Sequence, residues 1–339
     1  MPIGDALAQG GYRSVAVFGL AKNTGKTVTL NHLISEAHRM GKVLGLTSIG
    51  RDGETWDVLT HRRKPAVSVF PGTLLATAEE CLRTGMAVIE PLERTGIATP
   101  LGEVVIARVR AAGTVEIAGP GRAGQLGATV RRLQALGSDL VLVDGAIDRR
   151  SLASPRVTEG CILATGAVLS ESMGEVVERT RARVGQLTLP EAPDEFKLSV
   201  KVGEVRILVG DRVETVPGIS KAGSKIRDLV KGREAAVLVG GALTDSLLET
   251  LVGSGVRVVV RDPTHVFVEA ALLQRFLRGG GRLETARPLR LAAVTVNPYS
   301  PGGWSFEARG FLEAMRRALP GVPVHDVVLE EAAEKNEKH

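Results

Sequence analysis

Short apolar runs alternate along the chain with longer segments in which apolar side chains recur every three or four positions. The first run, residues 14–19 (SVAVFG), is β-branched and apolar, which is typical of a buried strand. Residues 28–40 carry their apolar side chains on one face of a helix, and Gly41 is placed to end that helix. The pattern therefore predicts a strand followed by a helix near the start of the chain.

The alternation of strands and helices continues to residue 187. The remaining predicted strands are residues 42–49, 138–146 and 160–168, with a pair of strands in 103–119, and the predicted helices are residues 73–85, 123–137 and 170–187. Such alternation favours an α/β fold with a mostly parallel sheet and helices on both faces.

The pattern changes after residue 187 and is restored further on. Residues 188–232 contain prolines, turn residues and short alternating strands, so we expect a β-rich connector or insertion there. Strands and helices alternate again over residues 233–330, which predicts a second, smaller α/β domain. Residues 331–339 are predicted to form a solvated charged tail. A length of 339 residues also favours two domains, the first being residues 1–187.

Composition narrows the class of protein. With 44% hydrophobic residues, 3% aromatic residues and 40 glycines, the chain is typical of an α/β protein with many tight turns. The net charge of +5 comes from basic residues interleaved with acidic ones, so no nucleic-acid partner is expected. Cys81 and Cys161 lack the spacing of a disulfide framework or a zinc site. Neither a signal peptide nor a membrane-spanning stretch is evident, which predicts a cytoplasmic protein without membrane contact.

The segment GLAKNTGKT, residues 19–27, joins the first predicted strand to the first predicted helix, and we call it the glycine turn. Gly25 lets the backbone approach a phosphate, Lys26 supplies positive charge, and the Thr27 hydroxyl is placed at the helix start for Mg²⁺. The pattern is typical of a P-loop, and the alternative is a turn that only caps a helix. The predicted nucleotide-binding residues are Gly19, Lys22, Asn23, Thr24, Gly25, Lys26 and Thr27.

Acidic residues after the neighbouring strands are the candidate metal and catalytic groups. Asp144 ends the apolar run LVLVD and is the predicted Mg²⁺ ligand together with Thr27. Asp52, in the turn at residues 47–54, and Asp148 are the catalytic candidates beside Lys26. An ordinary turn with solvated charged residues would have the same sequence, so a purely structural role of Asp52 and Asp148 stays an open alternative.

Four charged residues close to Asp52 and Asp148 in the sequence are further candidates for the site. Arg51 and Glu54 lie in the turn that contains Asp52, while Arg149 and Arg150 follow Asp148 and would bind an anionic substrate. Their alternative role is that of ordinary solvated charges.

Other loops and missing motifs refine the hypothesis. The glycine- and proline-rich loops at residues 93–103 and 116–126 are expected at the same sheet edge, where they would form a second pocket or a partner surface. The loop at residues 296–307 carries Tyr299 and Trp304, which either pack on their own domain or dock a ligand. No Asn-Lys-x-Asp stretch is present, which favours ATP over GTP. The patterns of zinc hydrolases and serine hydrolases are also missing.

Five residues separate the two glycines of the glycine turn, one more than in the usual P-loop. This spacing resembles the dethiobiotin synthetase and cobyrinate synthase branch of P-loop proteins. Ala21 stands where partition and septum-site ATPases carry an extra lysine, so that sub-branch fits less well. Taken with TSIGRDGE, TGIATPLGE, DGAIDRRSLASP, LATGA and VNPYSPGGWSFE, the turn is similar to the ATPase-like reactivating subunit of adenosylcobalamin-dependent lysine 5,6-aminomutase and related aminomutases.

The resemblance implies a chaperone-like ATPase that uses ATP and Mg²⁺ to exchange damaged cobalamin on a partner aminomutase. A second reactivase subunit and a homodimer are further implied partners. The main alternative is a biosynthetic enzyme of the dethiobiotin synthetase kind, in which ATP activates a small carboxylate or carbamate. A nucleotide-binding regulatory module with negligible turnover is the third hypothesis.

Overall fold

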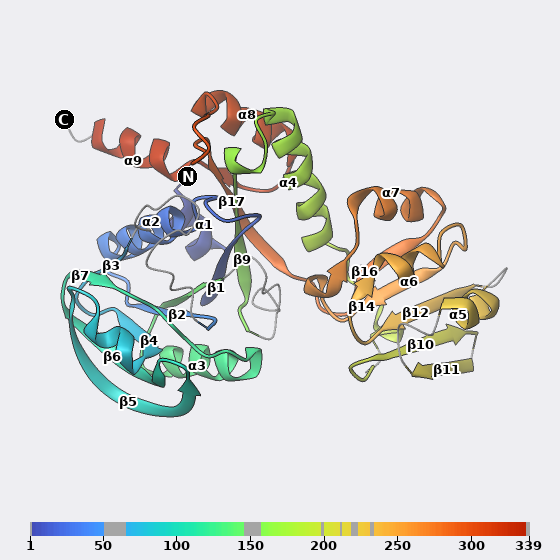
Figure 1. Cartoon of the computed structure of the whole chain (residues 1–339), viewed down its shortest axis with the longest axis horizontal. Coiled ribbons are helices and arrows are strands. Elements are labelled where there is room, and N and C mark those ends of the chain that lie inside the picture. The colour runs from blue at the N-terminus through green and yellow to red at the C-terminus, as the bar shows by residue number, and fades with distance from the viewer. Residues whose placement is uncertain are drawn as a thin grey trace. The chain divides into compact units, whose positions relative to one another are not determined.

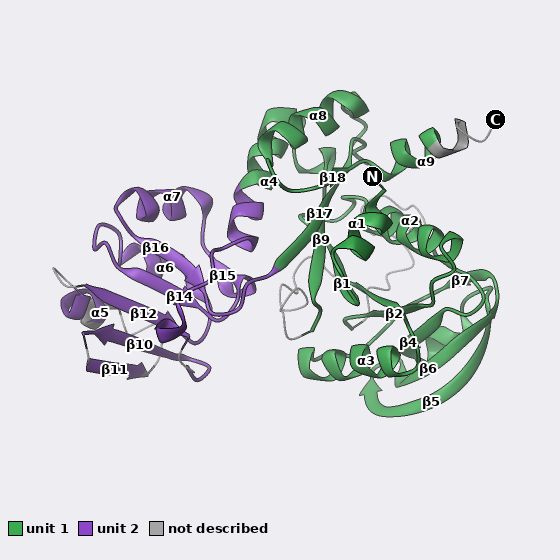
Figure 2. Cartoon of the chain, turned by 180° about the vertical axis from the view of Figure 1, so that it is seen from behind, with its two compact units in different colours: residues 1–181, 290–339 green, residues 182–289 purple. Residues whose placement is uncertain are grey.

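The chain folds into two compact units. The computed structural model describes residues 2–50, 66–145, 157–197, 200–210, 212–217, 223–230 and 234–336. The first unit combines Met1–Arg181 with Arg290–His339, and the second is Ala182–Leu289 (Figure 2). The second unit is therefore inserted into the sequence of the first.

A nine-stranded sheet forms the centre of the first unit, in the order β18-β17-β9-β1-β8-β2-β4-β6-β5 (Figure 1). Its strands are β1 (Ser14–Gly19), β2 (Leu44–Ser48), β4 (Leu74–Ala78), β5 (Val88–Thr99), β6 (Gly102–Ala111), β8 (Leu140–Asp144), β9 (Gly160–Gly166), β17 (Arg290–Asn297) and β18 (Val324–His325). Neighbours from β18 to β4 pair in parallel, whereas β6 is antiparallel to β4 and to β5. The expected α/β fold with a mostly parallel sheet is confirmed.

Helices flank this sheet, and a short antiparallel pair, β3 (Val67–Val69) with β7 (Gly113–Val115), lies apart from it. The helices are α1 (Ile3–Gln9), α2 (Lys26–Arg39), α3 (Ala123–Ala135), α4 (Met173–Leu187), α8 (Ala308–Ala318) and α9 (Val327–Asn336), with the 3₁₀ helices η1 (Glu79–Arg83) and η3 (Ala167–Leu169). Helices α1 and α2 cover one face of the sheet, and α3 lies on the other (Figure 1).

Burial explains why these segments take their conformations. Every residue of β1 and β9 is buried, as expected for interior strands of a sheet covered on both faces. In α2, Leu30, Leu33 and Ile34 pack against the sheet, and Gly41, at φ +66°, follows the end of the helix.

The helix predicted over residues 73–85 is wrong. Leu74–Ala78 forms strand β4, and only Glu79–Arg83 is helical, as η1. All five residues of β4 are buried between β2 and β6, so sheet pairing and burial outweigh the helical preference of Leu and Ala.

The second unit has its own five-stranded sheet, in the order β11-β10-β12-β14-β16. Its strands are β10 (Glu204–Val209), β11 (Arg212–Pro217), β12 (Ala235–Val239), β14 (Arg257–Val260) and β16 (Arg282–Thr285), with a parallel bridge between β13 (Leu243–Thr244) and β15 (Val266–Phe267). Its helices are α5 (Gly223–Val230), α6 (Asp245–Glu249) and α7 (Ala270–Arg278), with the 3₁₀ helices η4 (Asp194–Phe196) and η6 (Pro263–His265). Phe276 of α7 is fully buried in the main core of this unit.

The domain boundaries of the structure differ from those predicted. Residues 188–232 are not a separate connector, because β10 pairs with β12 inside the second unit. The predicted second domain over 233–330 is wrong at its end, since β17 pairs with β9 and carries residues 290–330 into the first unit. The predicted charged tail is helical through Asn336 as part of α9.

The second unit is expected to fold in isolation, because residues 182–289 contain all five strands of its sheet and its core. Urea unfolding of this fragment, followed by circular dichroism, should show one cooperative transition. A fragment spanning 233–330 is the matched control. It lacks β10 and exposes apolar β17, so it should aggregate or unfold without a cooperative transition. A cooperative transition in the control but not in 182–289 would contradict the observed boundaries.

Candidate functional site

The glycine turn connects the end of β1 to the start of α2. Its Thr24 is 1% exposed, and the Thr24 hydroxyl donates a hydrogen bond to the Ala21 carbonyl over 3.1 Å. A Cβ atom on Gly19 would lie 2.2 Å from that hydroxyl oxygen, so only glycine fits there. Asn23 and Gly25 both have positive φ, +63° and +91°. The turn is therefore tight, and its geometry depends on residues that tolerate unusual backbone angles.

Lys26 is the first residue of α2 and reaches towards strand β8. Its Nζ donates a hydrogen bond to the Gly145 carbonyl oxygen over 2.6 Å. Gly145 directly follows Asp144, which pairs in register with Val17 of β1 and has a buried Oδ1 atom. The lysine ammonium and the predicted metal-binding carboxylate thus belong to one sheet edge, at the carboxyl ends of β1 and β8.

The other predicted residues of the turn lie around this pair. Thr27 is the second residue of α2 and is half-buried, whereas Lys22 and Asn23 are exposed. The first N–H groups of a helix have no partner within the helix, and the helix dipole favours an anion there. The start of α2 therefore has the donors, and Lys26 the charge, that a phosphate group requires.

Asn297 is a site residue that the sequence prediction missed. It ends β17, and its Nδ2 donates to the Asn23 carbonyl over 3.1 Å. A Cβ atom on Gly25 would lie 3.1 Å from the Asn297 Cβ, so Asn297 supports the turn on this side. A polar residue at the end of an apolar strand is the signal that identified Asp144, but the sequence places Asn297 in the predicted second domain, residues 233–330.

Several predicted residues lie outside the described part of the chain. These are Arg51, Asp52, Glu54, Asp148, Arg149 and Arg150.

The described residues at the end of β2 form contacts with the predicted loop at residues 116–126. The Gly50 N–H donates to the Pro120 carbonyl over 2.9 Å, and the Gly119 N–H donates to the Ser48 hydroxyl over 3.0 Å. The loop within 116–126 therefore lies against the carboxyl end of β2.

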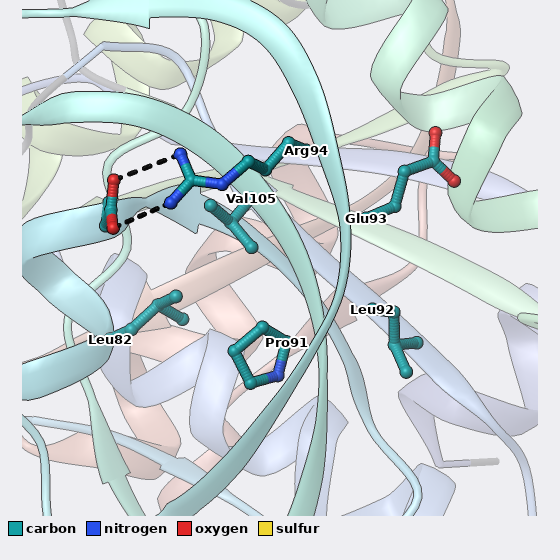
Figure 3. A pocket seen from close by; sticks show the side chains of 7 residues that line it. Leu82, Pro91, Leu92, Glu93, Arg94 and Val105 are labelled. Atoms are coloured by element: carbon teal, nitrogen blue, oxygen red, sulfur yellow. Dashed lines mark hydrogen bonds and ion pairs between the residues drawn. The ribbon is translucent and has the colours of Figure 1, made fainter.

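The expected loop at residues 93–103 is instead the end of a hairpin between β5 and β6. This hairpin and η1 line a pocket with a volume of about 170 Å³. Leu82, Pro91, Leu92 and Val105 are among its lining residues (Figure 3). Arg94 in its rim pairs with Glu79 over 2.9 Å and with Glu103 over 3.1 Å. Hydrogen bonds from the Gly96 N–H and from Arg94 lower the pKa of Glu103. The rim charges thus satisfy one another.

Trp304 and Tyr299, in the loop at residues 296–307, have different surroundings. The indole N–H of Trp304 donates to the Ala167 carbonyl over 2.9 Å, so this ring is anchored within the first unit. Tyr299 is 65% exposed. The loop contains Asn297, which donates a hydrogen bond to the glycine turn, so the loop begins beside that turn.

Comparison with protein-family models, curated proteins and solved structures found no match to this chain. Across the described ranges, no three His, Cys, Asp or Glu side chains are grouped so as to hold a metal ion. Among the described residues of the site, the Thr27 hydroxyl and the Asp144 carboxylate are oxygen ligands of the kind that Mg²⁺ takes together with water and phosphate oxygens. Within the same ranges, no helix is both long and apolar enough to cross a bilayer.

Gly25→Ala should destabilise the protein by about 1–2 kcal/mol, because alanine is strained at positive φ. Gly124→Ala is the matched control, since this glycine lies in α3 with no atom within 4 Å of an added Cβ. Urea unfolding measures both free energies. Equal stability of the two variants would show that the geometry of the turn does not constrain residue 25.

Proposed function

We propose that this protein is a P-loop ATPase that binds Mg-ATP at the glycine turn. The observation that carries the proposal is the hydrogen bond of Lys26 Nζ to the carbonyl beside Asp144, at the N-terminus of α2. Positive charge, helix N–H groups and a carboxylate at one sheet edge form the set of groups that a nucleoside triphosphate with its metal ion requires.

Each residue has a distinct role in this proposal. The backbone N–H groups of the turn and of α2 bind the phosphate oxygens, and Lys26 exchanges its carbonyl partner for the outer phosphates. Thr27 and Asp144 would hold Mg²⁺, directly or through water, and the bound ion would supply positive charge beside the transferring phosphoryl group. Asn297 keeps the turn in its binding geometry through the Asn23 carbonyl.

The proposed reaction is hydrolysis of ATP. A water oxygen forms a bond to the γ-phosphorus while the bond to the β,γ-bridging oxygen breaks, which gives ADP, phosphate and a proton. Lys26 stabilises the negative charge of the transferring group in the transition state. The candidates for orienting the water are Asp52 and Asp148, both from the sequence.

The energy of hydrolysis would drive reactivation of an adenosylcobalamin-dependent aminomutase. The resemblance in sequence supports this role, and the division into two units is compatible with it. A reactivating factor needs a nucleotide site and a surface that binds its partner differently in two nucleotide states. The first unit carries the glycine turn, and the second has a separate core and offers a separate surface.

The competing proposal is a biosynthetic enzyme that activates a small carboxylate or carbamate. The observation that favours it is the loop containing Gly119 and Pro120, which contacts the carboxyl end of β2 at the sheet edge of the glycine turn. A small acid bound there would accept the phosphoryl group in place of water.

Lys26→Ala should weaken Mg-ATP binding by about tenfold or more, because a charge-assisted hydrogen bond contributes about 1.5–3 kcal/mol. Lys42→Ala, which removes an exposed lysine after α2, is the matched control and should bind as the unaltered chain does. Isothermal titration calorimetry measures the affinities. Equal affinities of the two variants would remove the glycine turn from the nucleotide site.

Phosphate release separates the two proposed activities. An aminomutase holding inactivated cobalamin should stimulate hydrolysis of Mg-ATP by the unaltered protein, and Lys26→Ala and Asp144→Asn should abolish the stimulation. Turnover that depends on a small carboxylate, with no effect of the mutase, would instead support the biosynthetic enzyme. Tight ATP binding without turnover under either condition would contradict both.

A further inference from the structure

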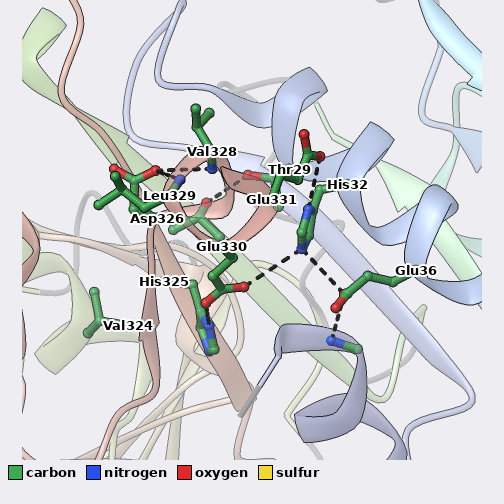
Figure 4. Close-up of polar contacts among 12 residues, drawn as sticks. Thr29, His32, Glu36, Val324, His325, Asp326, Val328, Leu329, Glu330 and Glu331 are labelled. Carbon is green, nitrogen blue, oxygen red and sulfur yellow. Dashed lines mark hydrogen bonds and ion pairs between the residues drawn. The ribbon is translucent and has the colours of Figure 1, made fainter. Parts of the chain in front are cut away.

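A partly buried group of ionisable side chains joins α2 to the C-terminal helix α9 (Figure 4). At its centre is His32 of α2, which is 1% exposed. The His32 Nδ1 lies 3.1 Å from Glu331 Oε1, and its Nε2 lies 3.7 Å from Glu330 Oε2. Glu36, one turn further along α2, places Oε2 3.5 Å from the same Nε2. We call His32, Glu36, Glu330 and Glu331 the α2–α9 cluster.

The α2–α9 cluster places three carboxyl groups around one imidazole. Both ring nitrogens of His32 face carboxylate oxygens, and a neutral imidazole has one nitrogen with a lone pair in place of a hydrogen. That lone pair would point at a carboxylate. A proton on the ring or on one of the carboxyl groups would remove that repulsion, and both states contain the same number of protons.

Burial favours the protonated form of one acidic member, Glu36. Desolvation raises the pKa of Glu36, while His32 and the Gly4 N–H, which donates to Glu36 Oε2 over 2.8 Å, lower it to a smaller extent. Glu330 adds to the rise, and Arg39 opposes it. A raised pKa means that the protonated form is favoured in the folded state. This contribution to the free energy of unfolding is therefore present at low pH and is lost as the pH rises through the raised pKa.

Two ionisable residues directly before α9, His325 and Asp326, lie beside the α2–α9 cluster or at the start of α9. His325, at the end of β18, places Nδ1 2.5 Å from Glu330 Oε1, so Glu330 lies between two imidazoles. The Nε2 atoms of both histidines are buried and have no hydrogen-bond partner in the described part of the chain. Asp326 accepts hydrogen bonds from the Val328 and Leu329 N–H groups at the start of α9, and burial raises its pKa.

We propose that the α2–α9 cluster is a proton-dependent clamp, which holds α9 on α2 while it contains its shared proton and releases α9 when that proton is lost. The charged groups that face His32 are the carboxylates of α2 and α9, with His325 and Arg39 beside them. No nucleotide takes part in the clamp, so its test does not depend on the proposed function.

Hydrogen exchange of the full-length protein tests the clamp. Protection factors for the amides of residues 327–336, corrected for intrinsic exchange, should fall by about tenfold or more as the pH rises through the raised pKa of Glu36, since one unit of linked pKa change is a factor of ten. His32→Gln should lower the protection at the acidic end and remove most of its pH dependence. His38→Gln is the matched control, because this exposed histidine of α2 stacks on Phe70 outside the cluster.

A second variant covers the possibility that His32→Gln does not fold. Glu331→Gln alters the cluster member whose side chain is 45% exposed, and it should also reduce the pH dependence. Protection that does not change with pH in the unaltered protein would overturn the proposal. Equal effects of His32→Gln and His38→Gln would do the same. Protection that a chelator removes would identify a metal site in place of a proton-dependent clamp.

Discussion

The pairing of β17 with β9 is the constraint on which both the fold and the candidate site depend. It runs from Arg290 opposite Gly160 to Asn297 opposite Gly166, after the chain has passed through the whole second unit. Gly166 permits the close approach, because a Cβ atom there would lie 2.5 Å from the Asn297 carbonyl oxygen. The strand then places Asn297 against the glycine turn and the Thr295 hydroxyl 2.9 Å from that of Thr29 in α2. One strand therefore closes the first unit, fixes the turn and brings α9 to α2.

Local pattern explains which elements could be predicted. The strands at β1, β8 and β9 and the helix α2 have the burial periods that their sequences indicate, and glycines stand at their ends. The segment 73–85 failed because its leucine, alanine and glutamate residues favour a helix in isolation, and burial within the sheet decides otherwise. The assignment of β17 failed for a different reason. Its apolar run does not specify a partner strand, and β9 is separated from it by more than a hundred residues of sequence.

The candidate site follows the same division. The residues of the glycine turn are contiguous, so their spacing alone predicts that they act together, and the strand-end rule locates Asp144. Lys26 donates a hydrogen bond to the carbonyl oxygen of Gly145, the residue that follows Asp144. Asn297 obeys the same strand-end rule, yet it was missed because the rule requires knowing which strands share a sheet. Topology, and not residue chemistry, limits what the sequence predicts here. Asp52 and Asp148 lie outside the described residues and stay predictions.

An ionisable core between α2 and α9 is an unusual way to dock a helix. Apolar side chains of similar volume would hold α9 at least as well, because removing charges from water costs free energy that their pairing only partly recovers. What the α2–α9 cluster provides, and an apolar contact does not, is dependence on a single proton. Helix α2 also starts at the glycine turn, so a change in the position of α9 and a change at the turn act on the same rigid element. If α2 changes position both when α9 is released and when a ligand binds at the glycine turn, the two events are thermodynamically linked. Ligand binding then changes the free energy of α9 release by the same amount as α9 release changes the free energy of ligand binding.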